Sequence, residues 1–410
     1  MRTKTKLLPL LFLLLVLALA GGAGAQSDAP HGSTSQDEVI GDGTAASCQT
    51  EDAANAFAAA VAAGGVISFD CGPAPVVIEV NTNVTDQQVT VNGGGLINLS
   101  GEDLRQIFYV TGSGDLTLND IILQDGASAQ GGAIYAEAQA TVTLRRSFVT
   151  SNNASGEGGG VYNLGTLNVE DTTFGSNITQ LHGGGIFNNG GTVTITDSYL
   201  ISNQAPNGSG GAVYTVGGQV TVNRSAVRSS FIGNQGGGIF AAGPTGITNS
   251  TFSNNRALQG GALFAVADVS ILNATFNENR ADTAGAIWRA ASSNTTIKNS
   301  IVAGSLDTDG NAPSLNCDGP PLISLGRNIV DDNTCVSGSP GDLLATDPQL
   351  GVWYGSPLRA YIPAATSPAL DYALDCPPVD QRGYPRPLGA GCDSGSIERG
   401  DVVYLPFFVR

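Results

Sequence analysis

Charged residues are scarce in this chain, and basic residues are the scarcer kind. Asp, Glu, Lys and Arg together form 13% of the 410 residues, whereas they form roughly a quarter of an ordinary soluble domain. The chain has 18 Lys and Arg against 35 Asp and Glu. Because nucleic acid is bound through clusters of Lys and Arg, this acidic composition argues against nucleic acid as a partner.

Histidine is nearly absent, which excludes the commonest catalytic arrangements. The two histidines are His31, near the N-terminus, and His182, which precedes three glycines and has no obvious partner. A Ser-His-Asp constellation cannot be assembled from one usable histidine. We interpret His182 as a surface residue, and the alternative is a catalytic role.

Carboxylates suited to catalysis are also few in the middle of the chain. Among the acidic residues from Asp120 to Asp282, only Glu170 and Asp171 are adjacent. Neighbours on a strand point to opposite faces, so these two do not form the facing pair that glycoside hydrolysis needs. The segment 307–311 spaces its oxygen side chains as a calcium loop does but lacks the closing Glu, so we interpret it as a turn. We expect no catalytic residue, no metal site and no cofactor.

Arginines recur near the spacing of the repeats described below. A row of arginines could bind the carboxylates of uronic acids. We favour instead the explanation that these arginines form solvated ion pairs with acidic residues on the surface. The residues are Arg145, Arg146, Arg256, Arg280 and Arg289.

Long hydrophobic runs are missing except at the start of the chain. Residues 1–25 have the pattern of a secretory signal peptide, with three basic residues, an apolar run of about 14 residues and an Ala-Gly-Ala end. The alternative, an uncleaved anchor helix, is disfavoured because this run is short for a bilayer. Removing the signal leaves 15 basic and 35 acidic residues, a net charge of −20. We expect no transmembrane segment in this mature chain.

Six cysteines behind a signal peptide suggest three disulfides. The spacing favours pairs of near neighbours, and all six cysteines flank the central part of the chain, so we interpret the bridges as clamps on its two ends. A thiolate metal site is disfavoured because there is no Cys-x-x-Cys pair. The expected pairs are Cys48 with Cys71, Cys317 with Cys335, and Cys376 with Cys392.

Glycine is abundant, at 56 residues, and it marks a repeat. A small-residue step, an aliphatic residue and an aromatic residue recur seven times, with gaps of 24 to 27 residues between the aromatics. A fixed period of this length indicates stacked supersecondary units that bury their apolar faces against one another. The aromatics are Tyr135, Tyr162, Phe187, Tyr214, Phe240, Phe264 and Trp288.

Short alternating segments within each repeat predict strands with one buried face. No helical pattern interrupts them, and about 25 residues with Gly or Asn corners fit one coil of a parallel β-helix. We expect roughly ten coils over residues 66–305. The aliphatic neighbours of the aromatics should fill the interior and the aromatics should line the outside. That interior column is Ile134, Val161, Ile186, Val213, Ile239, Leu263 and Ile287.

Asparagines follow an apolar or aromatic residue at about the same period, and can bond side chain to side chain at stacked corners. The long step from Asn203 to Asn234 predicts an outward detour around residues 225–230. The expected ladder is Asn152, Asn177, Asn203, Asn234, Asn255 and Asn279.

The N-terminal region predicts a cap on the first coil. Residues 26–45 read as a flexible leader, and residues 46–71 as a cap containing a helix and a first strand. The helix begins after Thr50 and ends at Gly64, with Phe57 and Val61 on one face. A helix laid across the first coil would cover apolar surface that has no preceding coil.

The two repeated signals resemble the repeats of the chlamydial polymorphic outer membrane proteins. They are written here as Gly131-Gly132-Ala133-Ile134-Tyr135 and Phe252-Ser253-Asn254-Asn255, and the resemblance covers about residues 110–300. It implies a right-handed parallel β-helix of the pectin-lyase-like class that serves surface display and adhesion. This chain lacks the large C-terminal membrane barrel of that family, so the export route does not carry over.

Residues 306–400 are richer in Pro, Asp and Cys and resemble the C-terminal module of bacterial choice-of-anchor Q proteins. Six motifs match in order, among them Ser324-Leu325-Gly326-Arg327-Asn328 and Cys392-Asp393-Ser394-Gly395-Ser396-Ile397-Glu398. The resemblance implies a secreted bacterial β-helix protein whose tail carries an attachment signal. Here the apolar tail, residues 401–410, is either a last strand over the end of the coils or a short sorting signal.

Together these patterns predict an all-β, right-handed parallel β-helix with an N-terminal capping helix and a disulfide-bearing C-terminal cap module. We expect a secreted or surface-displayed bacterial protein that is non-catalytic and adhesive or glycan-binding, with a polysaccharide or a host or neighbouring surface as partner. The alternative functions are a pectin-lyase-like polysaccharide lyase or glycoside hydrolase, and a structural spacer. A groove that gathers carboxylates with Arg or Lys on one outer face would favour the enzyme.

Overall fold

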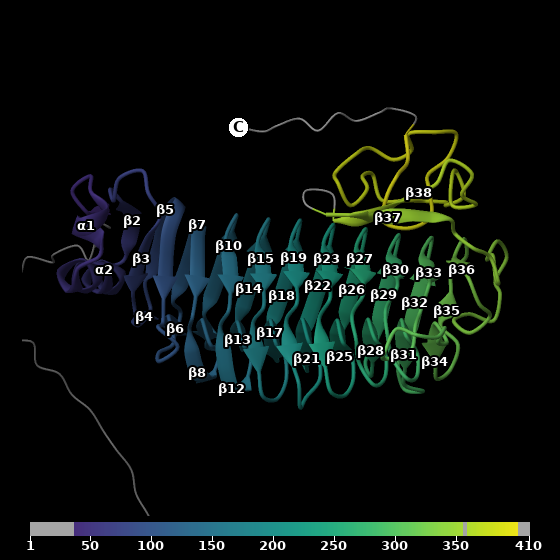
Figure 1. Cartoon of the computed structure of the whole chain (residues 1–410), viewed down its shortest axis with the longest axis horizontal. Coiled ribbons are helices and arrows are strands. Elements are labelled where there is room, and N and C mark those ends of the chain that lie inside the picture. Colours follow the sequence, from purple (N-terminus) through teal and green to yellow (C-terminus); the bar gives the residue numbers. More distant parts are fainter. Residues whose placement is uncertain (1–36, 356–358, 401–410) are drawn as a thin grey trace, which may run out of the picture. The chain divides into compact units, whose positions relative to one another are not determined.

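The computed structural model describes residues 37–355 and 359–400. The predicted signal peptide, residues 1–25, and the apolar tail, residues 401–410, lie outside this part. Within it the chain forms a parallel β-solenoid, as predicted, with two short helices and many short strands (Figure 1). Equivalent strands of successive coils pair in parallel and in register.

Each coil contributes strands to a set of ladders that run along the solenoid. The first ladder contains β2 (Gly65–Phe69), the first half of β5 (Gln88–Ser100), the first half of β7 (Asp115–Gln124), β10 (Thr141–Arg145), β14 (Thr166–Glu170), β18 (Thr192–Thr196), β22 (Gln219–Asn223), β26 (Thr245–Thr248), β29 (Val269–Leu272), β32 (Thr295–Lys298) and β35 (Ile323–Ser324). The second contains β3 (Val76–Glu79), the second halves of β5 and β7, β11 (Phe148–Thr150), β15 (Thr173–Gly175), β19 (Tyr199–Ile201), β23 (Ala226–Arg228), β27 (Thr251–Ser253), β30 (Thr275–Asn277), β33 (Ile301–Ala303) and β36 (Ile329–Val330).

Two further ladders complete the coils. A short one contains β8 (Ala127–Gln130), β12 (Asn153–Glu157), β16 (Ile178–Thr179), β20 (Gln204–Ala205) and β24 (Phe231–Ile232). A 10-stranded one contains β4 (Thr82–Thr85), β6 (Phe108–Thr111), β9 (Ile134–Ala136), β13 (Val161–Asn163), β17 (Ile186–Asn189), β21 (Val213–Val216), β25 (Ile239–Ala242), β28 (Leu263–Ala265), β31 (Ile287–Arg289) and β34 (Cys317–Asp318).

The 10-stranded ladder separates aliphatic from aromatic side chains. All seven aliphatic residues predicted to be interior are fully buried, and Val161 lies between Ile134 and Ile186 in register. The aromatic residues lie on the outer side, where Tyr109 extends the predicted column by one coil. Successive rings in this column stack with centroids 4.1 to 5.3 Å apart. The predicted assignment of inside and outside is therefore confirmed.

Asparagine side chains form a buried ladder at the corner after the second ladder of strands. The Asn152 Nδ2 donates to Asn177 Oδ1 at 2.9 Å, and the Asn177 Nδ2 donates to Asn203 Oδ1 at 3.0 Å. The prediction that Asn234 belongs to this ladder was wrong, because Asn234 is exposed. Ser230 takes its place in the ladder, and the backbone N–H of Ser230 donates to Asn255 Oδ1 at 3.1 Å. Because the spacing through Ser230 is regular, no detour occurs at residues 225–230.

The N-terminal cap is built from β1 (Glu38–Ile40), α1 (Ala45–Cys48) and α2 (Glu51–Ala63). The side chain of Thr50 caps α2, and Gly64 ends it at φ 79°. Phe57 and Val61 are fully buried, as the predicted face requires. The leader prediction, residues 26–45, was wrong for its last part, because β1 pairs in parallel with β2 and buries Ile40.

The solenoid continues beyond residue 305, so the predicted end of the coils lies too early. Strands β34, β35 and β36 pair with β31, β32 and β33 and complete one more coil. Asn328 belongs to this coil, because its side-chain oxygen accepts the backbone N–H of Ser300 at 3.1 Å.

The remaining C-terminal segment, which includes the antiparallel pair β37 (Leu350–Tyr354) and β38 (Ala360–Pro363), packs along the second ladder of strands. The Tyr361 hydroxyl donates to Glu278 at 2.6 Å, Thr251 Oγ1 donates to Gln381 Oε1 at 2.6 Å, and the Arg228 guanidinium lies 4.4 Å from the centre of the Trp353 ring. The segment therefore covers the flank of the coils rather than their end.

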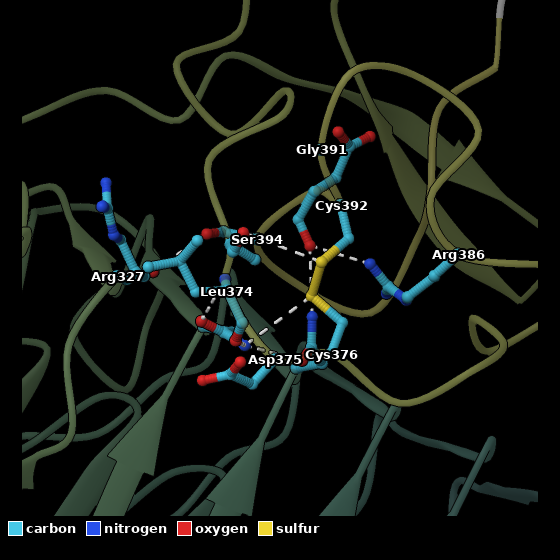
Figure 2. The surroundings of a disulfide bond; sticks show 12 residues. Arg327, Leu374, Asp375, Cys376, Arg386, Gly391, Cys392 and Ser394 are labelled. Atoms are coloured by element: carbon cyan, nitrogen blue, oxygen red, sulfur yellow. Dashed lines mark hydrogen bonds between the residues drawn. A yellow bond between two sulfur atoms is a disulfide. The ribbon is translucent and has the colours of Figure 1, made fainter.

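All three predicted disulfides are present. Cys48–Cys71 lies in the N-terminal cap and Cys317–Cys335 in the last coil, so these two are at the ends as expected. Cys376–Cys392 instead ties together the segment on the flank, beside Leu374 and Ser394 (Figure 2). Three disulfides are typical of proteins from oxidising, extracellular environments.

Within residues 37–355 and 359–400, no helix is long and apolar enough to cross a membrane.

The interior column gives a stability prediction. Replacing Ile186 by Asp places an unpaired carboxylate in a dry coil, which costs several kcal/mol, so we expect Ile186→Asp to unfold or to melt far below the parent. Thermal unfolding followed by circular dichroism measures this. Thr192→Asp, on the exposed side of β18, is the matched control and should melt near the parent. Equal melting of Ile186→Asp and the parent would contradict the assignment of inside and outside.

A buried carboxyl in the flank segment gives a pH prediction. Burial raises the pKa of Asp393 to about 6, although the backbone N–H groups of Arg399 and Asp371 donate to it. Because its pKa is raised in the folded state, the folded protein binds the proton more tightly. Its stability therefore falls, by at most about 3 kcal/mol, as pH rises from about 4 to 6.

Asp393→Asn should remove this part of the pH dependence. Denaturant unfolding at several pH values, followed by Trp353 fluorescence in a Trp288→Phe background, measures it. Parallel pH profiles for the two proteins would refute the assignment of the titration to Asp393.

Candidate functional site

One column of corner residues organises the outer surface between the first and second ladders of strands. Each of its members directly follows the residues that a coil contributes to the first ladder, Asp120 doing so within β7, and has a left-handed backbone with φ between 44° and 53°. Asn and Asp tolerate this conformation better than other residues with side chains. The members, in order, are Asp120, Arg146, Asp171, Asp197, Arg224, Asn249, Asn273 and Asn299.

The two halves of this corner column have different roles. The asparagine half is covered by the C-terminal segment: Asn249 Nδ2 donates to the carbonyl of Val379 at 2.8 Å, and Asn299 Nδ2 donates to that of Leu374 at 2.7 Å. The charged half lines two adjoining hollows of about 420 and 190 Å³. We call these hollows together the charged groove.

The charged groove has one wall from the coils and one from the C-terminal segment. The two hollows share Asp171, Asp197 and Arg224. The larger is also lined by Arg145, Arg146, Asn168, Glu170, Thr194 and Thr196, all from the coils. The smaller is also lined by Ser198, Ala226, Arg359, Gln381 and Arg382, the last three from the C-terminal segment.

Glu170 and Asp171 do not point to opposite faces, which corrects the sequence-based expectation. Glu170 ends β14, whereas Asp171 has φ 44° and so leaves the extended conformation on which alternation depends. Both are exposed and both line the charged groove. The corner conformation thus gathers carboxylates and arginines on one outer face, the feature that would favour an enzyme.

Most charges of the groove are neutralised in ion pairs. The Arg146 guanidinium donates to both oxygens of Asp120, at 2.8 and 2.7 Å, and that of Arg224 to both oxygens of Asp197, at 2.7 and 2.5 Å. Arg145 pairs with Glu170 at 2.9 Å. These contacts confirm the expected pairing of Arg145 and Arg146 with acidic residues.

The ion pairs also set the protonation of the groove. The hydrogen bond from Arg146 holds the pKa of Asp120 below its ordinary value, and the bond to Asp197 raises the pKa of Arg224. A general acid for glycoside hydrolysis needs a raised pKa. Asp120 is therefore unsuited to donate a proton.

Arg359 and Asp171 are the charged groups of the groove that make no salt bridge within residues 37–355 and 359–400. The Arg359 guanidinium lies 5.0 Å from the centre of the Tyr199 ring, and its buried Nε has no hydrogen-bond partner there. Burial lowers the pKa of Arg359, while the charge of Asp171 opposes this effect.

The other arginines expected from the repeat spacing are scattered. Arg256 lies over the Phe231 ring and near Asp309 at 3.7 Å, whereas Arg289 is buried and donates to the carbonyl of Ser293 at 2.8 Å. They do not form a shared surface with Arg145 and Arg146. The segment 307–311 closes as a turn, because the Asp307 carboxylate accepts the backbone N–H of Asn311 at 2.7 Å.

His182 is half-buried rather than a bare surface residue. Its ring stacks on Tyr214 at 4.6 Å, and Nδ1 accepts the backbone N–H of Ser209 at 3.1 Å. Burial lowers the pKa of His182. These contacts give it a packing role, and no carboxylate or hydroxyl nucleophile is bonded to it in the part of the chain described.

The rings of the outer aromatic column are buried in three coils and half-buried in the others. Tyr162, Phe187 and Phe264 retain 5 to 7% exposure, because each ring is covered by the rings of the neighbouring coils. Such stacking stabilises cross-strand pairs. The column is therefore explained by coil packing without a sugar ligand.

A separate hollow, of about 510 Å³, lies beside α2 and the first coils, away from the charged groove. Glu79 and Arg105 are among the residues that line it. A hydrogen bond with Glu102 and the negative charge of Glu102 raise the pKa of Glu79. No group of three or more metal-ligating side chains occurs in the described ranges.

Residues 249–266 match the family model of the Chlamydia polymorphic membrane protein repeat. This segment contains both repeated signals, Phe252 to Asn255 at the asparagine corner and Gly260 to Phe264 in the 10-stranded ladder. The chain is thus a β-helix repeat protein. No curated protein and no solved structure matches it.

Sequence reasoning missed Arg224, Arg359 and Arg382 as groove residues. Arg224 carried a usable signal, because a charged residue stands one position after a strand where later coils have Asn. Arg359 and Arg382 carried none, since they reach the groove only by packing of the C-terminal segment.

The ion pairs of the charged groove are partly exposed, and this gives a prediction about their contribution to stability. Arg224→Gln should lower the free energy of unfolding by less than about 1 kcal/mol, because exposed ion pairs contribute little. Arg386→Gln should cost about 3–5 kcal/mol, because it leaves Glu398 as an unpaired charge and both side chains are fully buried. Denaturant unfolding measures both variants, and equal losses would contradict the contrast in burial.

Proposed function

We propose that this chain is a secreted or surface-displayed bacterial β-helix protein that binds a glycan chain in the charged groove without cleaving it. The observation that carries this proposal is the groove itself. It extends over four consecutive coils, from Arg146 to Arg224, and is lined by guanidinium, carboxylate, amide and hydroxyl groups. Such groups recognise sugar hydroxyls through hydrogen bonds, which are stronger when one partner is charged.

A binding role is supported over a catalytic one by the state of the carboxylates. Glu170, Asp197 and Asp120 are engaged by arginines, so they are occupied in holding the groove rather than poised for proton transfer. The resemblance of the repeats to surface proteins and the three disulfides support placement outside the cell.

The test is an array of plant, algal and bacterial glycans, scored both for retention of the full chain and for new reducing or unsaturated ends. We expect retention without new ends. Arg224→Gln, which should fold normally, should reduce retention. Cleavage products from the parent protein would refute the non-catalytic role.

The carboxyl pair beside α2 does not support the alternative function, a glycoside hydrolase. Glu79 and Glu102 are close enough for a hydrogen bond between them to raise the pKa of Glu79, whereas the two carboxyl groups of a glycoside hydrolase lie about 5 to 9.5 Å apart across the sugar. Glu79→Gln should therefore change neither the retention of glycans nor the yield of cleavage products on the array.

A further inference from the structure

The charges of the groove balance, and this balance narrows the class of ligand. Three carboxylates and five arginines line it, and two further carboxylates, Asp120 and Asp380, pair with Arg146 and Arg382. Five positive charges thus face five negative ones. A groove built for a polyanion would carry an excess of positive charge, because affinity for polyanions comes from opposite charge.

The acidic character of the whole protein strengthens this point. The chain has nearly twice as many Asp and Glu as Lys and Arg. Its long-range field therefore repels anionic polymers before they reach the groove.

The salt bridges of the groove leave one arginine and one carboxylate without a partner of opposite charge. Arg145, Arg146, Arg224 and Arg382 each have a carboxylate partner. The fifth arginine, Arg359, and the fifth carboxylate, Asp171, have no salt bridge in the described ranges, although both line the smaller hollow and each lies within the electrostatic range of the other.

The two groups come from different walls of the groove. Asp171 belongs to the corner column of the coils, and Arg359 precedes β38 of the C-terminal segment. The Nε of Arg359 is buried and out of reach of a ligand, but the terminal nitrogens of its guanidinium make no hydrogen bond in the described ranges and the residue lines the smaller hollow. A ligand that accepts from these nitrogens and donates to Asp171 would satisfy both groups.

We infer that the groove binds a neutral glycan whose hydroxyl groups bridge Arg359 and Asp171. This inference rests on the proposed function and specifies its ligand class. A sugar hydroxyl both donates and accepts hydrogen bonds, so adjacent hydroxyls satisfy a guanidinium and a carboxylate together. A carboxylate or sulfate group only accepts, and it would meet the like charge of Asp171.

Because one wall comes from residues 359–382, the ligand also contacts the coils and the C-terminal segment at once. The flank segment is then part of the binding site as well as a cover for the strands. Binding should therefore depend on a residue of each wall.

The test measures binding of the full chain to fluorescent hexasaccharides of neutral sugars, of galacturonate and of a sulfated glycan, at low and high salt. We expect a neutral hexasaccharide to bind with less than about twofold change in Kd between 50 and 500 mM salt, since no ligand charge is screened. Asp171→Asn and Arg359→Gln should each weaken it at least about tenfold, the loss of a hydrogen bond to a charged group.

We expect Asp171→Asn to fold as the parent does. Asn already occupies the corner column at three positions, so Asp171→Asn suits the backbone. Asp103→Asn is the matched control: Asp103 is exposed, has a left-handed backbone at φ 57°, and lies outside the groove. It should bind as the parent does.

The outcomes separate this inference from the proposed function. Tight, salt-sensitive binding of galacturonate or the sulfated glycan, strengthened by Asp171→Asn, would overturn the neutral ligand while leaving glycan binding in place. Neutral binding that is unchanged in both groove variants would also overturn it, since the site would lie elsewhere. Retention of no glycan at all, on the array or here, would overturn the proposed function itself.

Discussion

The structure depends on the stacking of coils in register. A single coil exposes its apolar interior at both open ends, and only a neighbour above and below covers it. Residues one period apart must therefore occupy the same place in each coil, as Ile134, Val161 and Ile186 do. Every column on the surface, whether aromatic, amide or charged, is a consequence of this register.

The columns show how one rule produces different surfaces. Aromatic rings stack on one another along the outside of the coils, and asparagines such as Asn177 bond to one another inside a corner. The corner column changes character along its length: its asparagines bind the C-terminal segment, whereas its charged residues remain open. The same backbone conformation thus supports an internal docking surface and a groove for a ligand.

The C-terminal segment links the fold to the proposed site. Its buried cluster, with Arg386 paired to Glu398, gives it a fixed shape, and contacts such as Asn249 with Val379 set its position on the coils. That position brings Arg359 to the edge of the groove. Burial of Asp393 makes the stability of the same segment depend on pH.

The sequence by itself determined the solenoid, its interior column and the three disulfides, because these depend on period, alternation and spacing along the chain. Asn234 and the leader were misjudged where a serine replaced the expected amide and where a short strand, β1, had little local signal. Only the tertiary structure decided the charged groove. Asp171 reaches it through a left-handed corner that breaks the alternation of a strand, and Arg359 through packing of a segment far along the chain. The corner position of Asp171 recurs with the repeat, but which residues face it across the groove is decided only by the packing of the C-terminal segment.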